Sequence, residues 1–176
     1  MFNELRRWLM AIFSRFRIPD VYVYTDGSCN NEGQGGWAAV ILYNNSVIEI
    51  CGSEDNTTNN RMELTAVLEA LKRIDEDVNI ILYSDSQYVV KGTENVFDWR
   101  KANWVTKSSG PVKNKELWQQ FVNLVSGKNN FKAVWVRGHN DVLYNERCDV
   151  LAKKERDKLI KTKTKPKLRG REYSYA

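Results

Sequence analysis

The order of strand-like and helix-like segments is the feature that most limits how this chain of 176 residues can fold. After Pro19, three segments rich in β-branched and aromatic residues come before the next helical spacing of apolar residues. The predicted strands are 21–25, 37–43, 47–52, 78–83 and 132–136, and the predicted helices are a segment after 60, then 86–91, 115–125 and 145–159. An antiparallel three-strand meander followed by two strands joined through helices predicts an α/β domain. Its five-stranded mixed sheet should carry helices on both faces.

The two ends of the chain differ from the middle. Residues 1–20 form an amphipathic basic extension, because apolar residues recur at helical spacing up to Pro19. We expect this helix to dock on the domain or on an unknown partner; a membrane-surface anchor or a targeting peptide is the alternative. Residues 21–160 form the domain, and residues 161–176 are predicted to be a disordered basic tail.

Charge and cysteine content narrow the classes of protein. The net charge is +5, but residues 1–20 and 156–176 are both basic, so the middle is net acidic and must bind its partners by local arrangement. The three cysteines, Cys29, Cys51 and Cys148, include no CxxC pair, which argues against a disulfide framework or a zinc site. We therefore expect a cytoplasmic protein with no stable membrane insertion, since no apolar run is long enough to span a bilayer.

Four carboxylates occupy strand ends and helix starts. Asp26 and Asp85 each follow a predicted strand, where α/β sheets gather their ligands. Glu63 follows Asn60 by three residues and Asp149 follows Asn145 by four, so both lie near predicted helix starts. Each residue also has a purely structural interpretation: a turn or cap for the aspartates after strands, a capping box for Glu63, and interaction with the helix dipole for Asp149.

A close cluster of four carboxylates repels itself unless hard cations neutralise it. With oxygen ligands alone, Mg²⁺ is the natural choice and Mn²⁺ a possible substitute. Two such ions together can catalyse phosphodiester cleavage. His139, the only histidine, lies in the loop that leads to Asp149, where a side chain that titrates near neutral pH suits proton transfer; its alternative is an incidental surface residue.

Five segments carry a family resemblance. In order and spacing they resemble the motifs of cellular, bacterial-like type 1 ribonucleases H, and the similarity covers about residues 21–155. The segments are Thr25–Cys29, Thr57–Leu64, Ser84–Val89, Val136–His139 and Asn145–Asp149. The resemblance implies a ribonuclease H-like fold and RNA–DNA hybrids as the substrate. The enzyme would cut the RNA strand by two-metal catalysis, leaving 3′-hydroxyl and 5′-phosphate ends, without strong sequence specificity.

The resemblance also implies roles for single residues. Asp26 would contact both metal ions, Glu63 and Asp85 the ion on the leaving-group side, and Asp149 the ion near the nucleophilic water. His139 would assist proton transfer or product release. The implied substrate-binding residues are Cys29, Asn31, Asn59, Asn60, Gln87 and Asn145, together with Trp99, Arg100, Lys101 and Trp104 of a basic protrusion. The physical alternative for the protrusion is a helix whose tryptophans pack inward.

Some features depart from the family pattern. Glu32 and Gln34 stand where relatives often have prolines, and residues 140–144 are more apolar than usual. The leader and the tail have no counterpart in the minimal enzyme.

We expect a monomer that acts independently. Two other hypotheses remain: another nuclease of the superfamily, such as a resolvase or integrase, and a catalytically weak hybrid-binding module.

Overall fold

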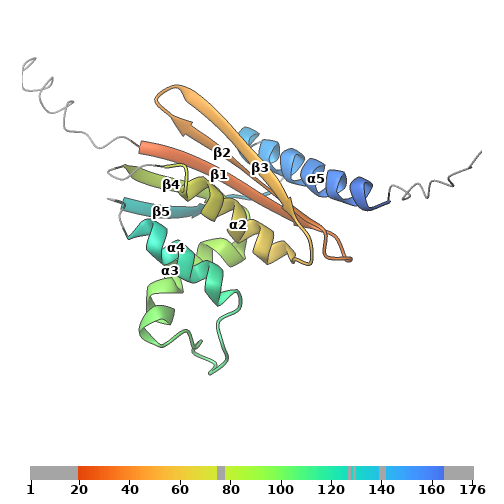
Figure 1. Ribbon diagram of the computed structural model, residues 1–176. Helices are drawn as coiled ribbons and strands as arrows, with labels where there is room; N and C mark the ends of the chain where they lie inside the picture. The colour runs from red at the N-terminus through yellow and green to blue at the C-terminus, as the bar shows by residue number, and fades with distance from the viewer. Residues whose placement is uncertain (1–19, 75–77, 127, 129, 139–141, 165–176) are drawn as a thin grey trace, which may run out of the picture.

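A computed structural model describes residues 20–164, except 75–77, 127, 129 and 139–141. Five strands form one sheet in the order β3-β2-β1-β4-β5 (Figure 1). β1, β2 and β3 pair antiparallel, whereas β4 and β5 continue the sheet in parallel. The strands are β1 (Asp20–Cys29), β2 (Gly35–Tyr43), β3 (Ser46–Glu54), β4 (Asn79–Ser84) and β5 (Asn130–Trp135). The predicted mixed sheet is thus confirmed.

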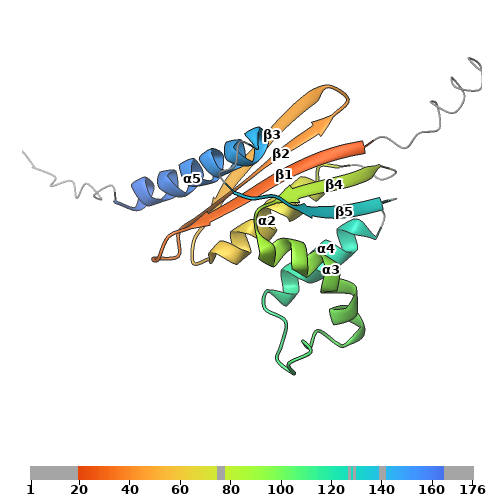
Figure 2. The ribbon, with the colours of Figure 1, turned by 180° about the vertical axis from the view of Figure 1, so that it is seen from behind.

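Helices cover both faces of this sheet. α5 (Leu143–Thr164) lies on one face of the sheet, and Figure 2 shows the molecule from that side. The opposite face carries α2 (Asn59–Leu71), α3 (Gln87–Lys101) and α4 (Lys115–Val125). The larger core lies beneath these three helices and includes Trp118, which is fully buried; a smaller core under α5 includes Cys148 and Leu151. The sheet therefore separates two apolar layers.

The hairpin between β2 and β3 is a two-residue turn. Asn44 and Asn45 have φ angles of 47° and 64°, and Tyr43 pairs directly with Ser46. Two central residues with positive φ make a turn whose twist matches that of the strands, and asparagine tolerates this conformation better than most residues. The predicted hairpin at this position is confirmed.

The first strand is longer than predicted. Its parallel pairing with β4 ends at Thr25 opposite Ser84, but its antiparallel pairing with β2 continues to Cys29. Asp26 therefore lies within β1 rather than after it, so the prediction that the strand ends before Asp26 is wrong. The turn signal in Asp26–Ser28 is overridden because β2 supplies partners for this stretch of backbone.

Two helices also exceed their predicted bounds. α3 continues ten residues past Lys91, because Val96 is buried against the same core as Trp118. α5 begins at Leu143 and ends at Thr164, so the first residues of the predicted tail are helical. The predicted amphipathic helix in residues 1–20 and the remaining tail, 165–176, lie outside the described residues.

The three cysteines carry free thiols, as predicted. Within the described part of the chain, no helix combines the length and the apolar character needed to cross a membrane.

Gly27 brings α2 against β1. A Cβ atom at this position would overlap the backbone of α2, with the amide nitrogen of Glu63 nearest and the carbonyl carbon of Met62 at 2.6 Å. The missing side chain at Gly27 therefore lets the start of α2 approach the strand that carries Asp26.

We expect Gly27→Ala to lower the free energy of unfolding by about 1–3 kcal/mol or more, because neither backbone segment has room to move. Chemical denaturation measures this. Gly110→Ala is the matched control, since its Cβ would meet only the Thr106 hydroxyl, at 3.8 Å. Equal effects of the two substitutions would contradict the close approach.

Candidate metal and nucleic-acid site

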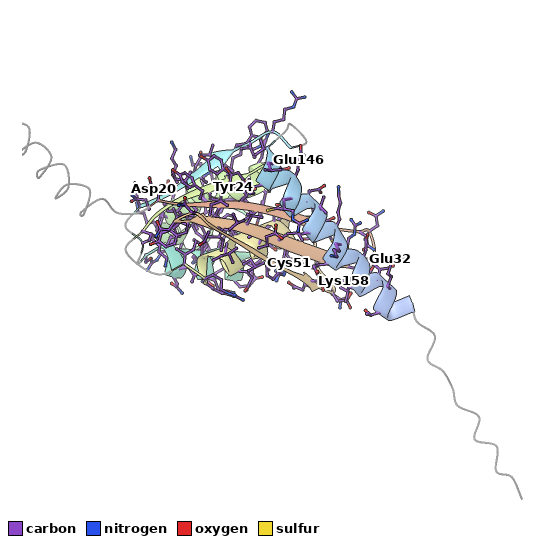
Figure 3. The ribbon with its side chains drawn as sticks, turned by 90° about the horizontal axis from the view of Figure 1, so that it is seen from above. Asp20, Tyr24, Glu32, Cys51, Glu146 and Lys158 are labelled. Atoms are coloured by element: carbon purple, nitrogen blue, oxygen red, sulfur yellow. The ribbon has the colours of Figure 1, made fainter. Side chains whose placement is uncertain are left out.

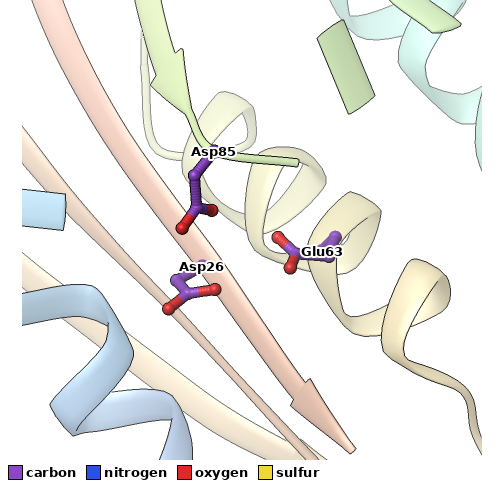
Figure 4. A group of neighbouring side chains, drawn as sticks. All are labelled: Asp26, Glu63 and Asp85. Carbon is purple, nitrogen blue, oxygen red and sulfur yellow. The ribbon is translucent and has the colours of Figure 1, made fainter. Parts of the chain in front are cut away.

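Three carboxylates meet where β1 and β4 part. Asp26 comes from β1, Glu63 from α2, and Asp85 follows the last residue of β4 (Figure 4). One oxygen from each lies within 4.8 Å of the others. Asp26 and Glu63 are only 7% and 5% exposed, so their charges have little water around them. The structure therefore brings together three of the four predicted carboxylates at the edge of the sheet where α/β proteins place their ligands.

Asp85 is held by three neighbours. The indole Nε1 of Trp135 donates to its main-chain oxygen at 3.0 Å, and Asn145 Nδ2 donates to its Oδ2 at 3.3 Å. Gly138 lies so close that a Cβ there would stand 2.5 Å from Asp85 Oδ2. Backbone and side chain are both restrained, so the carboxylate points at the other two acids. Trp135 and Gly138 were missed as site residues, because their sequence pattern indicates only a strand and a turn.

Glu63 is not a capping residue. Thr58 caps α2 by accepting from the Arg61 amide, which places Glu63 one turn further into the helix. Asn59 Nδ2 lies 3.4 Å from Glu63 Oε1, while the buried Oε2 has no hydrogen-bond partner. An unpaired buried carboxylate oxygen is costly. The capping-box interpretation is therefore wrong, and this oxygen is available to a cation.

Asp149 lies beyond the first turn of α5, because that helix begins at Leu143. Interaction with the helix dipole is weaker there than predicted. Its negative charge acts on Asp26 and raises the pKa of that group, and its Oδ2 accepts from Lys153 Nζ at 2.8 Å. Asp149 therefore flanks the cluster on the α5 side and is more exposed than Asp26 or Glu63.

The cluster strongly favours protons or cations. Burial, and then the charges of Asp85 and Asp149, raise the pKa of Asp26 to about 7. Burial, followed by the charges of Asp26 and Asp85, raises the pKa of Glu63 well above its usual value. Two raised pKa values mark a site that is poorly compensated as it stands. An all-oxygen donor set with one unpaired buried oxygen fits a hard divalent cation such as Mg²⁺ or Mn²⁺.

Several predicted substrate-binding residues come from β1, the turn after it, α2, α3 and α5. The Cys29 amide donates to Asn59 Oδ1 at 3.1 Å, which joins the end of β1 to the start of α2. Asn31 and Asn60 are exposed, and Gln87 is the exposed first residue of α3. Asn145 is buried beside Asp85, and its Oδ1 has no hydrogen-bond partner among the residues that the structure describes. His139 lies outside the described residues.

The predicted protrusion is partly helical. Trp99, Arg100 and Lys101 form the last turn of α3, which extends beyond the predicted helix 86–91. Trp99 packs edge-on against Trp118 with ring centroids 5.7 Å apart, as the inward-packing interpretation expects, whereas Arg100 and Lys101 are exposed. Trp104 is half-buried against the same core. A groove beside this segment is lined by Gln87, Lys91, Trp99 and Lys113, among others.

Tyr88 was also missed by the sequence reasoning. Its hydroxyl accepts from Asn114 Nδ2 at 2.9 Å and Trp118 Nε1 at 3.0 Å, and lies 3.3 Å from the Lys113 carbonyl. These bonds join α3 to the start of α4. The sequence has no signal for them, because the three partners come together only in the tertiary structure.

The raised pKa of Asp26 predicts the pH dependence of stability. Between its ordinary value of 3.8 and about 7, the unfolded chain has released this proton while the folded chain retains it. The free energy of unfolding of the metal-free protein should therefore fall as pH rises through this range. In EDTA, we expect Asp26→Asn to be more stable than the wild type by roughly 1–4 kcal/mol at about pH 8 and equally stable at about pH 4.

Urea denaturation at both pH values, with and without Mg²⁺, measures the difference. Mg²⁺ should stabilise the wild type alone. Asp98→Asn serves as control, because the Asp98 side chain is 72% exposed on α3. If Asp26→Asn raised the free energy of unfolding equally at both pH values, the ionisation of Asp26 would not be the cause.

Comparisons with known proteins agree with this geometry. A family model described as RNase H matches residues 19–157. The Ribonuclease H of Polaromonas naphthalenivorans (strain CJ2) is 48% identical over 137 residues, which cover 76% of this chain and 85% of that protein. The Ribonuclease H of Acetivibrio thermocellus is 47% identical over 138 residues, which cover 77% and 93%.

Solved structures also match this chain. The crystal structure of LC9-RNase H1, described as a type 1 RNase H with the type 2 active-site motif, is 32% identical with a TM-score of 0.70, and the match covers 81% of this chain and 74% of that one. A foamy viral protease-reverse transcriptase in complex with an RNA/DNA hybrid is 18% identical with a TM-score of 0.66, over 79% of this chain and 20% of that one, and shows the fold alone. The chain therefore belongs to the ribonuclease H family of hydrolytic nucleases, in its bacterial type.

Proposed function

We propose that this enzyme hydrolyses the RNA strand of RNA–DNA hybrids at the carboxylate cluster, with two Mg²⁺ ions and without strong sequence preference. The observation that carries the proposal is the group formed by buried Asp26 and Glu63 with half-buried Asp85, with one oxygen of each within 4.8 Å of the others. Water would attack the phosphorus and the bond to the 3′ oxygen would break. The products are then a 3′-hydroxyl and a 5′-phosphate.

The four carboxylates divide the metal binding between them. The charges of Asp85 and Asp149 both act on Asp26, which would contact both ions. Glu63 and Asp85 would hold one ion, and Asp149 the other. Bound Mg²⁺, or Mn²⁺ in its place, supplies Lewis-acid stabilisation to the attacking and leaving oxygens.

Other residues of the chain would position the substrate. Cys29, Asn59, Asn60 and Gln87 would line the minor groove and contact the RNA, whose 2′-hydroxyl distinguishes it from DNA, and Asn31 would face the DNA strand. Amide side chains both donate and accept, so they tolerate many sequences. Two relatives carry the name Ribonuclease H, which supports a hybrid as the substrate.

The remaining predicted residues complete the proposal. Arg100 and Lys101, with Trp99 and Trp104 behind them, would contact phosphates, because exposed cations beside aromatic rings suit a nucleic-acid backbone. Asn145 would orient Asp85 and the substrate, and His139 would move a proton. We also propose that the protein is a cytoplasmic monomer, a location that suits its three free thiols.

The substrate class is tested by one cleavage assay with Mg²⁺. Matched RNA–DNA hybrid, double-stranded DNA and double-stranded RNA should give cleavage of the hybrid alone, in its RNA strand. End-labelling should find 3′-hydroxyl and 5′-phosphate products. Cleavage of duplex DNA without cleavage of the hybrid would favour another nuclease of the superfamily.

The metal site is tested by Asp26→Asn. We expect hybrid cleavage to fall by a factor of about 10³ or more, because removing a group that acts as part of a catalytic unit disables that unit. Binding of the hybrid, measured by fluorescence anisotropy in Ca²⁺, should change little. Asp98→Asn should keep full activity, since Asp98 is exposed on α3. Persistent cleavage by Asp26→Asn would refute the proposed site, and binding without cleavage by the wild type would indicate a binding module.

A further inference from the structure

The turn between β1 and β2 is shaped by one residue, Asn30. Its Oδ1 accepts from the amides of Glu32 and Gln34 at 3.1 and 2.9 Å, and its Nδ2 donates to Gln34 Oε1 at 2.6 Å. The Gly33 amide, at a φ of 83°, donates to the Asn30 carbonyl at 3.2 Å. These local bonds fix the shape of the turn. Its placement in the molecule therefore depends on what holds its two ends.

One side of the turn rests on the start of α2. The Thr57 amide donates to the Gly33 carbonyl at 3.0 Å, and the Cys29 amide donates to Asn59 Oδ1 at 3.1 Å. Cys29 Sγ also lies 3.5 Å from the Thr57 carbonyl. These contacts tie the turn to the helix that carries Glu63.

The other side is held from α5 by Arg156. Its Nη1 donates to Ser28 Oγ at 2.7 Å, while its Nε and Nη2 donate to Asp157 Oδ1 at 3.0 and 2.8 Å. Ser28 is only 8% exposed and directly precedes Cys29. The guanidinium is thus oriented by Asp157 and directed at the base of the turn. Figure 3 labels Glu32 in the turn and Lys158 in the second half of α5 at the same end of the molecule.

Gly36 sets the distance between α5 and the sheet at this point. Gly36 pairs with Ser28 across the two strands. A Cβ at Gly36 would lie 2.6 Å from the Arg156 amide nitrogen and would overlap the carbonyl oxygen of Ala152. The backbone of α5 therefore rests on the β1–β2 pair, and the Arg156 side chain reaches Ser28 from a fixed position.

We propose that Arg156 is a positioning residue, which holds the turn Cys29–Gln34 in place for the hybrid and so sets the affinity for substrate rather than the rate of cleavage. The proposal rests on the proposed function, in which Cys29 lines the minor groove and Asn31 faces the DNA strand. Arg156 acts through Ser28, because its donors are directed at Ser28 and Asp157. Loss of this contact leaves the turn intact but held only by the β1–β2 ladder and by α2, without the contact from α5.

The experiment compares Arg156→Ala, Ser28→Ala and the double variant with the wild type. Each single substitution should raise KM for the hybrid about three- to tenfold, as expected for loss of one charge-assisted hydrogen bond, and keep kcat within about twofold. The double variant should be no worse than either single one, because both remove the same contact. The dependence of KM on salt should keep its slope, since no phosphate contact is lost.

Arg147→Ala is the matched control on the same helix. Arg147 donates to both carboxylate oxygens of Glu49 on β3, each at 2.8 Å, far from the turn in the sequence. Arg147→Ala should lower the melting temperature about as much as Arg156→Ala does and leave KM for the hybrid unchanged. An unchanged KM for Arg156→Ala with a lowered melting temperature would overturn the proposal, because the contact would then be merely structural.

Two further outcomes also decide the question. If Ser28→Ala is silent while Arg156→Ala raises KM and reduces the salt slope by about one, Arg156 binds phosphate directly and the proposal is wrong. Amide hydrogen exchange of Cys29–Gln34 tests the contact without any nucleic acid, and it should be faster in both single variants. Faster exchange in a protein that does not cleave hybrids would refute the proposed function but keep the positioning role; unchanged exchange would overturn the positioning role.

Discussion

The parallel pairing of β1 with β4 is the constraint on which the rest of this molecule depends. It ends at Thr25 opposite Ser84, one residue before Asp26 and Asp85. From that point β1 stays in the sheet through β2, while the chain leaves β4 towards α3. The two carboxylates therefore stand on either side of the place where two strands part. A site at such a parting has rigid walls, because both strands are still held by their ladders of hydrogen bonds.

Electrostatic repulsion at this parting is opposed by close packing around it. The pKa values of Asp26 and Glu63 are raised chiefly by burial and then by neighbouring carboxylates. The chain holds these groups together with glycines that let backbones approach: Gly27 beneath α2 and Gly138 against Asp85. The cluster therefore costs folding free energy without a cation, and a bound divalent ion would recover it.

The residues that we propose to bind the substrate come from separate elements of the fold. The turn after β1 is held by α2 through Asn59 and by α5 through Arg156. Gln87 begins α3, next to the Tyr88 hydroxyl that ties α3 to the start of α4. Each contact is local, yet together they align residues from β1, α2 and α3. In a ribonuclease H, this alignment is what a sequence-tolerant grip on a duplex requires, since backbone and sugar contacts position without reading bases.

The order of the elements, the mixed sheet, the Asn44–Asn45 hairpin and the acidic residues of the site could all be predicted from the sequence. Periodicity and turn chemistry are local properties, so they can be read from neighbouring residues. Five motifs in the order and spacing of the family also indicate ribonuclease H from the sequence. Strand and helix ends were less predictable: β1 runs past Asp26 because β2 is there to pair with it, and α3 runs to Lys101 because its buried face meets Trp118.

The sequence left each carboxylate with a structural interpretation and a metal-binding one, and the tertiary structure distinguishes between them. Glu63 looked like a capping residue until Thr58 proved to be the cap, and Asp149 looked like a dipole partner until α5 proved to begin at Leu143. The contacts of Trp135 and Asn145 with Asp85, and of Arg156 with Ser28, join residues 50 to 128 positions apart. Such contacts depend on how the sheet and helices pack, and packing is a property of the whole fold rather than of any one segment.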